Sequence, residues 1–141
     1  MILDTSALLA IVLGEPDGPR YLEALVAAER PRMSAANWLE ASMMVEEKGG
    51  RLAGLRFDEF IRAAGIEIVP VSAEQATVAR GAWRYFGRFR HAHRLNYGDC
   101  LAYALAKTES DRLLYKGRDF DHTDIEPAIQ PEETVLQEIQ D

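Results

Sequence analysis

The chain has 141 residues, a length that favours one domain with a substantial buried core. Hydrophobic residues make up 48% of it and charged residues 28%, an ordinary globular composition that argues against disorder. The formal net charge of −7 argues against a protein that binds nucleic acid by bulk positive charge. The single cysteine, Cys100, excludes an internal disulfide and a cysteine-based zinc site, and it suits a reducing cytoplasm. No apolar run approaches the roughly 18 residues of a membrane helix, so we expect a cytoplasmic protein without a membrane span.

The first six residues are typical of a short buried strand that leads into a helix. Ile2 and Leu3 form an apolar run that ends at Asp4. Ser6 stands where the N-cap of a helix over residues 7–13 is expected. Asp4 is therefore predicted to lie at the carboxyl end of a strand, beside a helix N-terminus. Ligands bind at this edge in open α/β sheets.

Helix and strand patterns alternate through the rest of the chain. Further helices are expected over 18–28, from residue 34 or 37 to 48, and over 52–64, 72–86 and 97–108. Strands are expected over 66–69 and 113–115, while residues 32–34 fit a very short strand or an extended segment. Residue 125 and residues 135–139 are candidates for a last strand and a short C-terminal helix. This alternation predicts an α/β fold, a single domain over residues 1–141 with a central, mainly parallel sheet flanked by helices.

Four acidic residues occupy positions that a solvated surface explains poorly: Asp4, Glu40, Asp99 and Asp119. Asp4 and Asp119 follow predicted strands. Glu40 and Asp99 lie near the starts of predicted helices, and Asn96 is the expected N-cap of the helix that contains Asp99. Because strand ends and the following helix starts share one edge of a parallel sheet, all four are expected to converge. Converging carboxylates repel one another unless a cation is present, and all-oxygen surroundings suit Mg²⁺ or Mn²⁺. For any one of them alone, interaction with a helix dipole is an equal alternative.

Four segments carry a resemblance to a known family: Asp4-Thr5-Ser6, Glu40 in a mid-chain helix, Asn96-Tyr97-Gly98-Asp99 before an Ala/Leu-rich run, and Asp119-Phe120. In this order, and over nearly the whole chain, they resemble a PIN domain, in particular the VapC-type toxins of bacterial toxin–antitoxin pairs. The resemblance implies a Mg²⁺- or Mn²⁺-dependent endoribonuclease with Asp4, Glu40, Asp99 and Asp119 as catalytic acids, supported by Ser6 and Asn96. It also implies a homodimer that a cognate antitoxin holds inactive and that cuts a structured RNA, such as a transfer or ribosomal RNA.

The expected mechanism is metal-assisted hydrolysis of an RNA phosphodiester bond. We expect Asp4 and Asp99 to bind the metal directly, and Glu40 and Asp119 to act through water or a second ion. The last acid departs from the Thr-x-Asp-x-Asp-Phe pattern of many relatives, because the segment over 116–121 offers both Asp119 and Asp121. Asp119 is favoured, since it precedes the aromatic residue and lies nearer the predicted strand.

A segment without acidic residues, 75–98, leads to the third of these acids. On its predicted helix, Arg80, Arg84 and Arg88 recur every four residues, opposite an apolar face that includes Ala79, Trp83 and Phe86. Arg84, Arg88 and Arg90 are the candidates for binding RNA phosphates, and a solvated helix face is the equal alternative. His91 and His93 are expected on the surface, and Cys100 in the core.

Two other functions compete with the ribonuclease. One is another Mg²⁺-dependent phosphohydrolase, although a phosphoaspartyl phosphatase needs a second aspartate at the position that Ser6 occupies. The other is a catalytically silent module whose acids bind a basic partner peptide. Metal titration with RNA and with small phosphate esters separates these functions.

Overall fold

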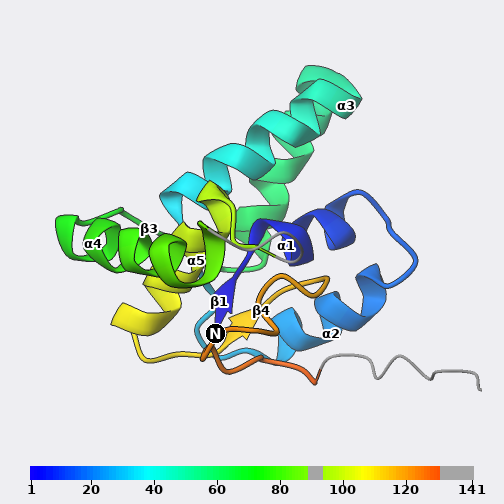
Figure 1. Ribbon diagram of the computed structural model, residues 1–141. Coiled ribbons are helices and arrows are strands. Elements are labelled where there is room, and N and C mark those ends of the chain that lie inside the picture. Colours follow the sequence, from blue (N-terminus) through cyan, green and yellow to red (C-terminus); the bar gives the residue numbers. More distant parts are fainter. Residues whose placement is uncertain (89–93, 131–141) are drawn as a thin grey trace, which may run out of the picture.

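A computed structural model describes residues 1–88 and 94–130 of the chain (Figure 1). Its centre is a four-stranded sheet with the strand order β3-β2-β1-β4, in which every neighbouring pair is parallel. The strands are β1 (Ile2–Leu3), β2 (Arg32–Ser34), β3 (Glu67–Val69) and β4 (Leu113–Leu114). Because all four strands run in the same direction, their carboxyl ends lie together at one edge of the sheet, as the sequence predicts.

Helices cover both faces of this sheet (Figure 1). The helical elements are α1 (Thr5–Val12), α2 (Gly18–Ala27), α3 (Ala35–Ala63), α4 (Ala73–Ala82), a π-helical turn η1 (Trp83–Gly87) and α5 (Tyr97–Thr108). One apolar core lies between the sheet and α4 and α5, and the other between the sheet and α1, α2 and α3. The described part of the chain therefore forms three layers, the α/β/α arrangement expected from the sequence.

The strands β1 and β4 are apolar throughout because both faces of the sheet are buried. In β1, Ile2 contributes to the core beneath α5, and Leu3 to the core beneath α1 and α3. Leu113 and Leu114 of β4 divide between the two cores in the same way. Successive side chains of a strand point to opposite faces, so two residues per strand suffice to tie both layers to the sheet.

Helix α3 folds back on itself at Gly50, where φ is +77°. This left-handed conformation favours glycine, and it separates the two helices that the sequence predicts on either side of Gly49-Gly50. The two halves form a pair of arms that projects from the body of the molecule (Figure 1). The first arm starts at the carboxyl end of β2, where the side chain of Ser34 caps it by accepting a hydrogen bond from the Ala36 backbone N–H.

Three local predictions need correction. The N-cap of α1 is Asp4 and not Ser6, because the helix already begins at Thr5 and the Asp4 carboxylate accepts the Ser6 backbone N–H. The helix after Ser72 does not keep the predicted apolar face to Phe86: α4 ends at Ala82, which is buried, and Trp83, where the π turn η1 starts, is 44% exposed. Residue 125 lies beside an isolated parallel bridge between Leu113 and Pro127, not in a strand.

Other predictions fall outside the described residues, namely Arg90, His91, His93 and the C-terminal helix over 135–139. Within the described part of the chain, no helix combines the length and the apolar character that crossing a membrane requires.

Candidate active site

Asp4 is the most constrained acid at the carboxyl edge of the sheet. Its side chain is buried, with 2% of the residue exposed, and its backbone N–H continues the sheet by donating to the Leu114 carbonyl at 2.9 Å. One carboxylate oxygen, Oδ2, accepts hydrogen bonds from the backbone N–H of Ser6 at 3.0 Å and from its hydroxyl at 2.5 Å. The other oxygen, Oδ1, is buried and accepts no hydrogen bond from the described residues. A buried, charged oxygen without a partner is costly, so this atom marks a place for a positively charged ligand.

Ser6 connects two strands of the sheet at this edge. While its hydroxyl donates to Asp4, its oxygen accepts the backbone N–H of Lys116 at 2.9 Å, just after β4. The same hydroxyl therefore fixes both the orientation of Asp4 and the start of the loop that carries Asp119. The expectation that Ser6 supports the first aspartate agrees with these contacts.

Asp99 is held by a reciprocal pair of hydrogen bonds at the start of α5. The Asn96 side chain accepts the Asp99 backbone N–H at 2.9 Å, and Asp99 Oδ2 accepts the Asn96 backbone N–H at 3.1 Å. This capping box satisfies two of the N–H groups that a helix start leaves open. The capping box therefore fixes the position of the Asp99 carboxylate through residues that are neighbours in the sequence. The surrounding fold buries the residue, which is 8% exposed.

The carboxylate of Glu40 lies against the first turn of α5. A Cβ atom at Gly98 would stand 2.9 Å from Glu40 Oε1 and 3.0 Å from Oε2, so a side chain at this position would displace the Glu40 carboxylate. Asn37, one turn earlier on α3, donates from Nδ2 to the Gly98 carbonyl at 3.0 Å and is buried. These contacts bring the start of α3 and the start of α5 together, although the two residues of this hydrogen bond lie 61 positions apart in the sequence.

Asn37 and Gly98 contact each other at the acidic edge, and the sequence analysis assigned neither of them a place there, although Gly98 belongs to the quoted Asn96–Asp99 motif. The sequence suggested Asn37 only as a helix cap, and that role belongs to Ser34. Gly98 carried a usable signal, since glycine is a poor helix former and its presence in a first helical turn indicates a close approach by another group.

Repulsion from neighbouring acids contributes to the raised pKa values of Asp99 and Asp4. Burial raises the pKa of Asp99 to about 7, and the negative charges of Asp4, Asp119 and Glu40 add to that rise against the lowering effect of the Asn96 N–H. Burial also raises the pKa of Asp4 to about 6, with a further contribution from Glu40, while the Ser6 hydrogen bonds oppose it. The structure therefore brings Asp4, Glu40, Asp99 and Asp119 within electrostatic reach of one another.

Asp121 points elsewhere. Its carboxylate accepts the Tyr115 hydroxyl at 3.1 Å and pairs with Arg118 Nε at 3.6 Å. Of the two candidates for the last acid, Asp119 is the one whose charge acts on Asp99.

The chemical nature of the side chains at this edge suits a divalent cation, although the distances between them are too long for direct binding as the structure stands. Among residues 1–88 and 94–130, no three His, Cys, Asp or Glu side chains are close enough to hold an ion as they stand. Yet the side chains gathered here offer only oxygen donors, the set that Mg²⁺ and Mn²⁺ prefer. Asp4 Oδ1, which accepts no hydrogen bond within residues 1–88 and 94–130, and the raised pKa of Asp99 both indicate that a positive charge would be favourable at this edge.

The parallel sheet and its acidic edge define the class of the protein: the chain belongs to the PIN-domain family, whose sequence pattern it matches over residues 1–126. It is 45% identical to ribonuclease VapC30 of Mycobacterium tuberculosis over 132 residues, which cover 93% of this chain and 100% of that protein. Within the PIN domains, the chain thus belongs with the VapC ribonucleases.

Solved structures show the same fold. VapC20 of M. tuberculosis, a sarcin–ricin loop cleaving toxin, superimposes with a TM-score of 0.71 at 16% identity, covering 92% of this chain and 98% of that one. A toxin–antitoxin complex from Klebsiella pneumoniae gives 0.67 at 17% identity, covering 87% of this chain and 92% of that one.

Proposed function

We propose that this protein is a VapC-type toxin, an endoribonuclease that hydrolyses RNA phosphodiester bonds with a divalent cation and that a cognate antitoxin neutralises. One observation carries the proposal: a buried carboxylate, Asp4, has one oxygen fixed by Ser6 and the other without a partner among the described residues, beside the capped carboxylate of Asp99. The family membership and the 45% identity to a ribonuclease support the substrate class.

The four acids divide into two pairs by burial. Asp4 and Asp99, both buried, are the residues that would hold a Mg²⁺ or Mn²⁺ ion directly, and the exposed Glu40 and half-buried Asp119 would reach it through water or a second ion. Bound there, a divalent cation lowers the pKa of a water molecule and neutralises charge that develops on the phosphate. Ser6 and Asn96 keep the two buried carboxylates in place, so little reorganisation is needed when substrate arrives.

RNA is proposed to approach along the basic surface before α5. Arg84 and Arg88 are exposed, and the helix N-terminus capped by Asn96 favours phosphate oxygens. The two arginines do not share one row, because the π turn places Arg88 over the ring of Trp83, at 5.7 Å from its centroid. Arg90, the third predicted contact, lies outside the described residues.

Replacing Asp4 by asparagine tests the enzyme function directly. The amide oxygen of the asparagine can still accept the Ser6 hydrogen bonds, so the fold is retained while the charge is lost. Because changes around a metal ligand already cost about 10–100-fold in affinity or activity, we expect a loss of cleavage of roughly 100-fold or more in the presence of Mg²⁺ or Mn²⁺. Asp121→Asn is the matched control, since that carboxylate is bonded to Tyr115.

Total cellular RNA is the substrate of choice, because mapped cut sites identify the target, for which we propose a transfer or ribosomal RNA. Cleavage by a folded Asp4→Asn protein at the wild-type rate would contradict the proposal. Release of phosphate from small esters without RNA cleavage would instead support a phosphohydrolase.

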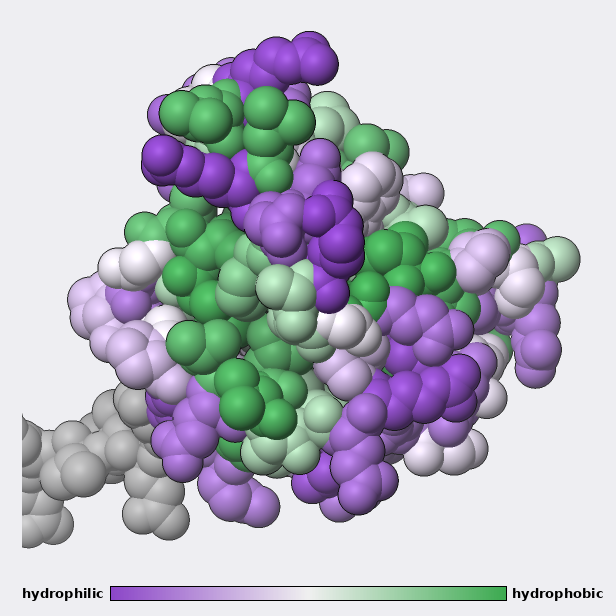
Figure 2. All heavy atoms as spheres, turned by 180° about the vertical axis from the view of Figure 1, so that it is seen from behind, coloured by the Kyte–Doolittle hydropathy of each residue, from purple (hydrophilic) through white to green (hydrophobic). Residues whose placement is uncertain are grey.

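An apolar groove is proposed as the binding site of the antitoxin. It has a volume of about 560 Å³, lies between the end of α1 and the two arms of α3, and includes Val12, Leu52 and Phe60. Seen from the side opposite to Figure 1, hydrophobic residues lie on the projecting α3 and, past a band of hydrophilic residues, on the body of the molecule (Figure 2). Such a patch on a small domain suits an amphipathic protein segment. Leu52→Glu should weaken antitoxin binding and leave RNA cleavage intact.

We also propose a homodimer. Leu39 and Met43 lie four residues apart on α3 and are 52% and 63% exposed, so they form an apolar stripe that a second copy would cover. Met43→Glu should convert the dimer to a monomer in sedimentation experiments. A dimer that persists unchanged would remove this stripe from the interface.

A further inference from the structure

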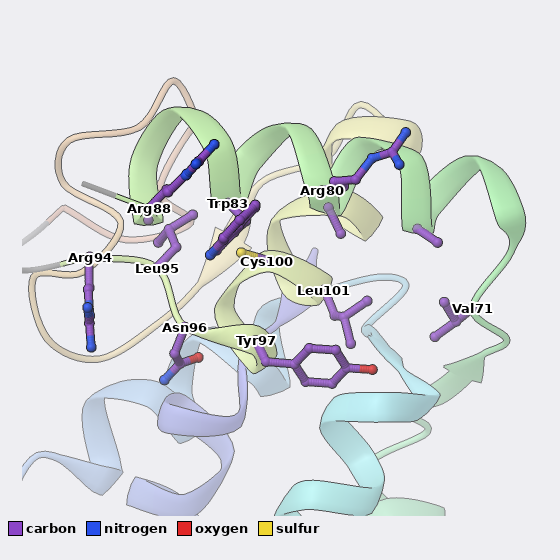
Figure 3. Close-up of a pocket in the computed structure, with 13 residues that line it drawn as sticks. Val71, Arg80, Trp83, Arg88, Arg94, Leu95, Asn96, Tyr97, Cys100 and Leu101 are labelled. Carbon is purple, nitrogen blue, oxygen red and sulfur yellow. The ribbon is translucent and has the colours of Figure 1, made fainter. Parts of the chain in front are cut away.

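A second cavity adjoins the acidic edge on the other side of the α5 start. It has a volume of about 630 Å³, within the range of about 300–1,000 Å³ typical of ligand pockets. The helix formed by α4 and η1 makes one wall, and the first turn of α5 with the preceding segment makes the other (Figure 3). In Figure 3, Trp83 extends from the first wall and Tyr97 from the second, so two aromatic rings border one cavity.

These two aromatic side chains are exposed without serving the core. Trp83 is 44% exposed and Tyr97 is 80% exposed. The π turn holds Trp83 in this position: the Arg88 backbone N–H donates to the Trp83 carbonyl at 2.7 Å, five residues back. π turns inside helices occur frequently at functional sites. A Cβ at Gly87 would stand 2.7 Å from the Leu95 carbonyl oxygen and 3.1 Å from Trp83 Cδ1, so glycine lets the segment before α5 and the tryptophan both lie close.

Positive charge surrounds the aromatic rings. Arg80, Arg88 and Arg94 line the cavity, and none of the described residues that line it is acidic. The protein as a whole carries a formal net charge of −7, so these arginines make the cavity a locally positive site on a negatively charged molecule. Arginine guanidinium groups and aromatic faces together are the surroundings in which proteins hold unpaired nucleotides.

The cavity and the acidic edge share one structural element. Asn96 lines the cavity, and the same residue forms the capping box with Asp99. A polynucleotide that crosses the start of α5 can therefore have a phosphate at the acidic edge and the neighbouring base in the cavity.

We propose that this cavity binds one unpaired nucleobase of the RNA, next to the cleaved phosphate, between Trp83 and Tyr97. The inference rests on the proposed ribonuclease function and adds to it a subsite that positions the substrate. It requires a single-stranded or flipped-out nucleotide at the cut, because a base stacked inside a duplex cannot enter.

Tryptophan fluorescence measures occupation of the cavity without any cleavage. The chain has two tryptophans, so in the Trp38→Phe protein the emission comes from Trp83 alone. The probes are a single-stranded adenylate oligomer, long enough to span the cavity and the acidic edge, and an abasic oligomer of equal length and charge, both in EDTA. We expect the adenylate oligomer to quench the emission and to bind more tightly than the abasic one.

Three substitutions give the matched comparison, with binding measured by anisotropy of a labelled adenylate oligomer. Trp83→Ala and Tyr97→Ala should each weaken binding by roughly 5- to 150-fold, the factor that corresponds to the loss of one stacked base. Trp83→Phe retains an aromatic face and should restore most of the affinity. As a control, Tyr85→Ala should have no effect, since Tyr85 is 81% exposed on the same turn but does not line the cavity.

Equal affinity for the adenylate and abasic oligomers would overturn the proposal. So would Trp83 emission that responds to protein concentration and not to RNA, because a second copy of the chain would then cover the cavity. These results are independent of the ribonuclease function: a protein that cuts RNA but binds both oligomers equally loses only the subsite, and one that binds adenylate through Trp83 but cuts nothing loses only the enzyme function.

Discussion

Replacing Asp99 by asparagine should stabilise the metal-free protein. The wild-type carboxylate has a pKa of about 7 in the folded state, against 3.8 for the free side chain, because it is buried near three other acids. The asparagine side chain keeps an oxygen that accepts the Asn96 N–H, so the capping box survives while the charge disappears. The substitution therefore removes repulsion without removing a structural hydrogen bond.

The sign and size of the effect follow from proton linkage. The folded state binds the Asp99 proton more tightly than the unfolded state, so the stability that protonation contributes is fully present below about pH 4. It is lost as the pH rises through about 7. At 1.36 kcal/mol per pKa unit, the full penalty is about 4 kcal/mol. Since neighbouring carboxylates readjust, we expect the advantage of Asp99→Asn to grow by about 2–3 kcal/mol between about pH 5 and pH 8.

Urea unfolding in EDTA at these two pH values measures the difference. Comparing variant with wild type cancels the titration of groups outside the acidic cluster. Asp121→Asn serves as control, because its partners are Tyr115 and Arg118 rather than the acidic cluster. The reasoning is refuted if wild type and Asp99→Asn lose the same free energy of unfolding between the two pH values.

Two further predictions concern the supports of the site, and a third concerns the opposite edge of the sheet. Ser6→Ala removes two hydrogen bonds to Asp4 and Lys116, so it should cost about 1–3 kcal/mol of stability in urea unfolding and reduce RNA cleavage; unchanged cleavage would argue against a positioning role. Gly98→Ala pushes a methyl group against the Glu40 carboxylate, so steady-state kinetics should show slower cleavage while circular dichroism shows an intact fold. Arg32→Ala removes the ion pairs of a buried arginine with Glu109 and Asp111 at the opposite edge of the sheet, while Asp111 keeps its pairing with the N-terminal amino group, so the free energy of unfolding should fall by about 1–3 kcal/mol, with cleavage positions unchanged.

The parts of the fold that local sequence specifies were predictable. The hydrogen bonds of Asn96 with Asp99, and of Ser72 with the Gln75 N–H, join residues three positions apart, and such spacing is visible without a structure. The strands that precede Asp4 and Asp119 were recognisable as short, wholly apolar runs. Strands of a sheet buried on both faces do not alternate between polar and apolar residues.

Other features depend on partners far away in the chain. The amide of Asn37 donates to a carbonyl 61 residues later, and buried Arg32 pairs with acids 77 and 79 residues later, so nothing in their own neighbourhood indicates them. The π turn escaped prediction because a regular spacing of arginines implies an uninterrupted α-helix. Arg88, which follows this turn, lies over the ring of Trp83, and both residues line the cavity.

Binding of Mn²⁺ in the absence of RNA, followed by electron paramagnetic resonance, examines the acidic edge most directly. The wild-type protein should bind the ion, and Asp4→Asn and Asp99→Asn should each lose that binding, while Asp121→Asn retains it. Mn²⁺ binding of equal strength in wild type and in both cluster variants would contradict the central claim that these carboxylates form the metal site.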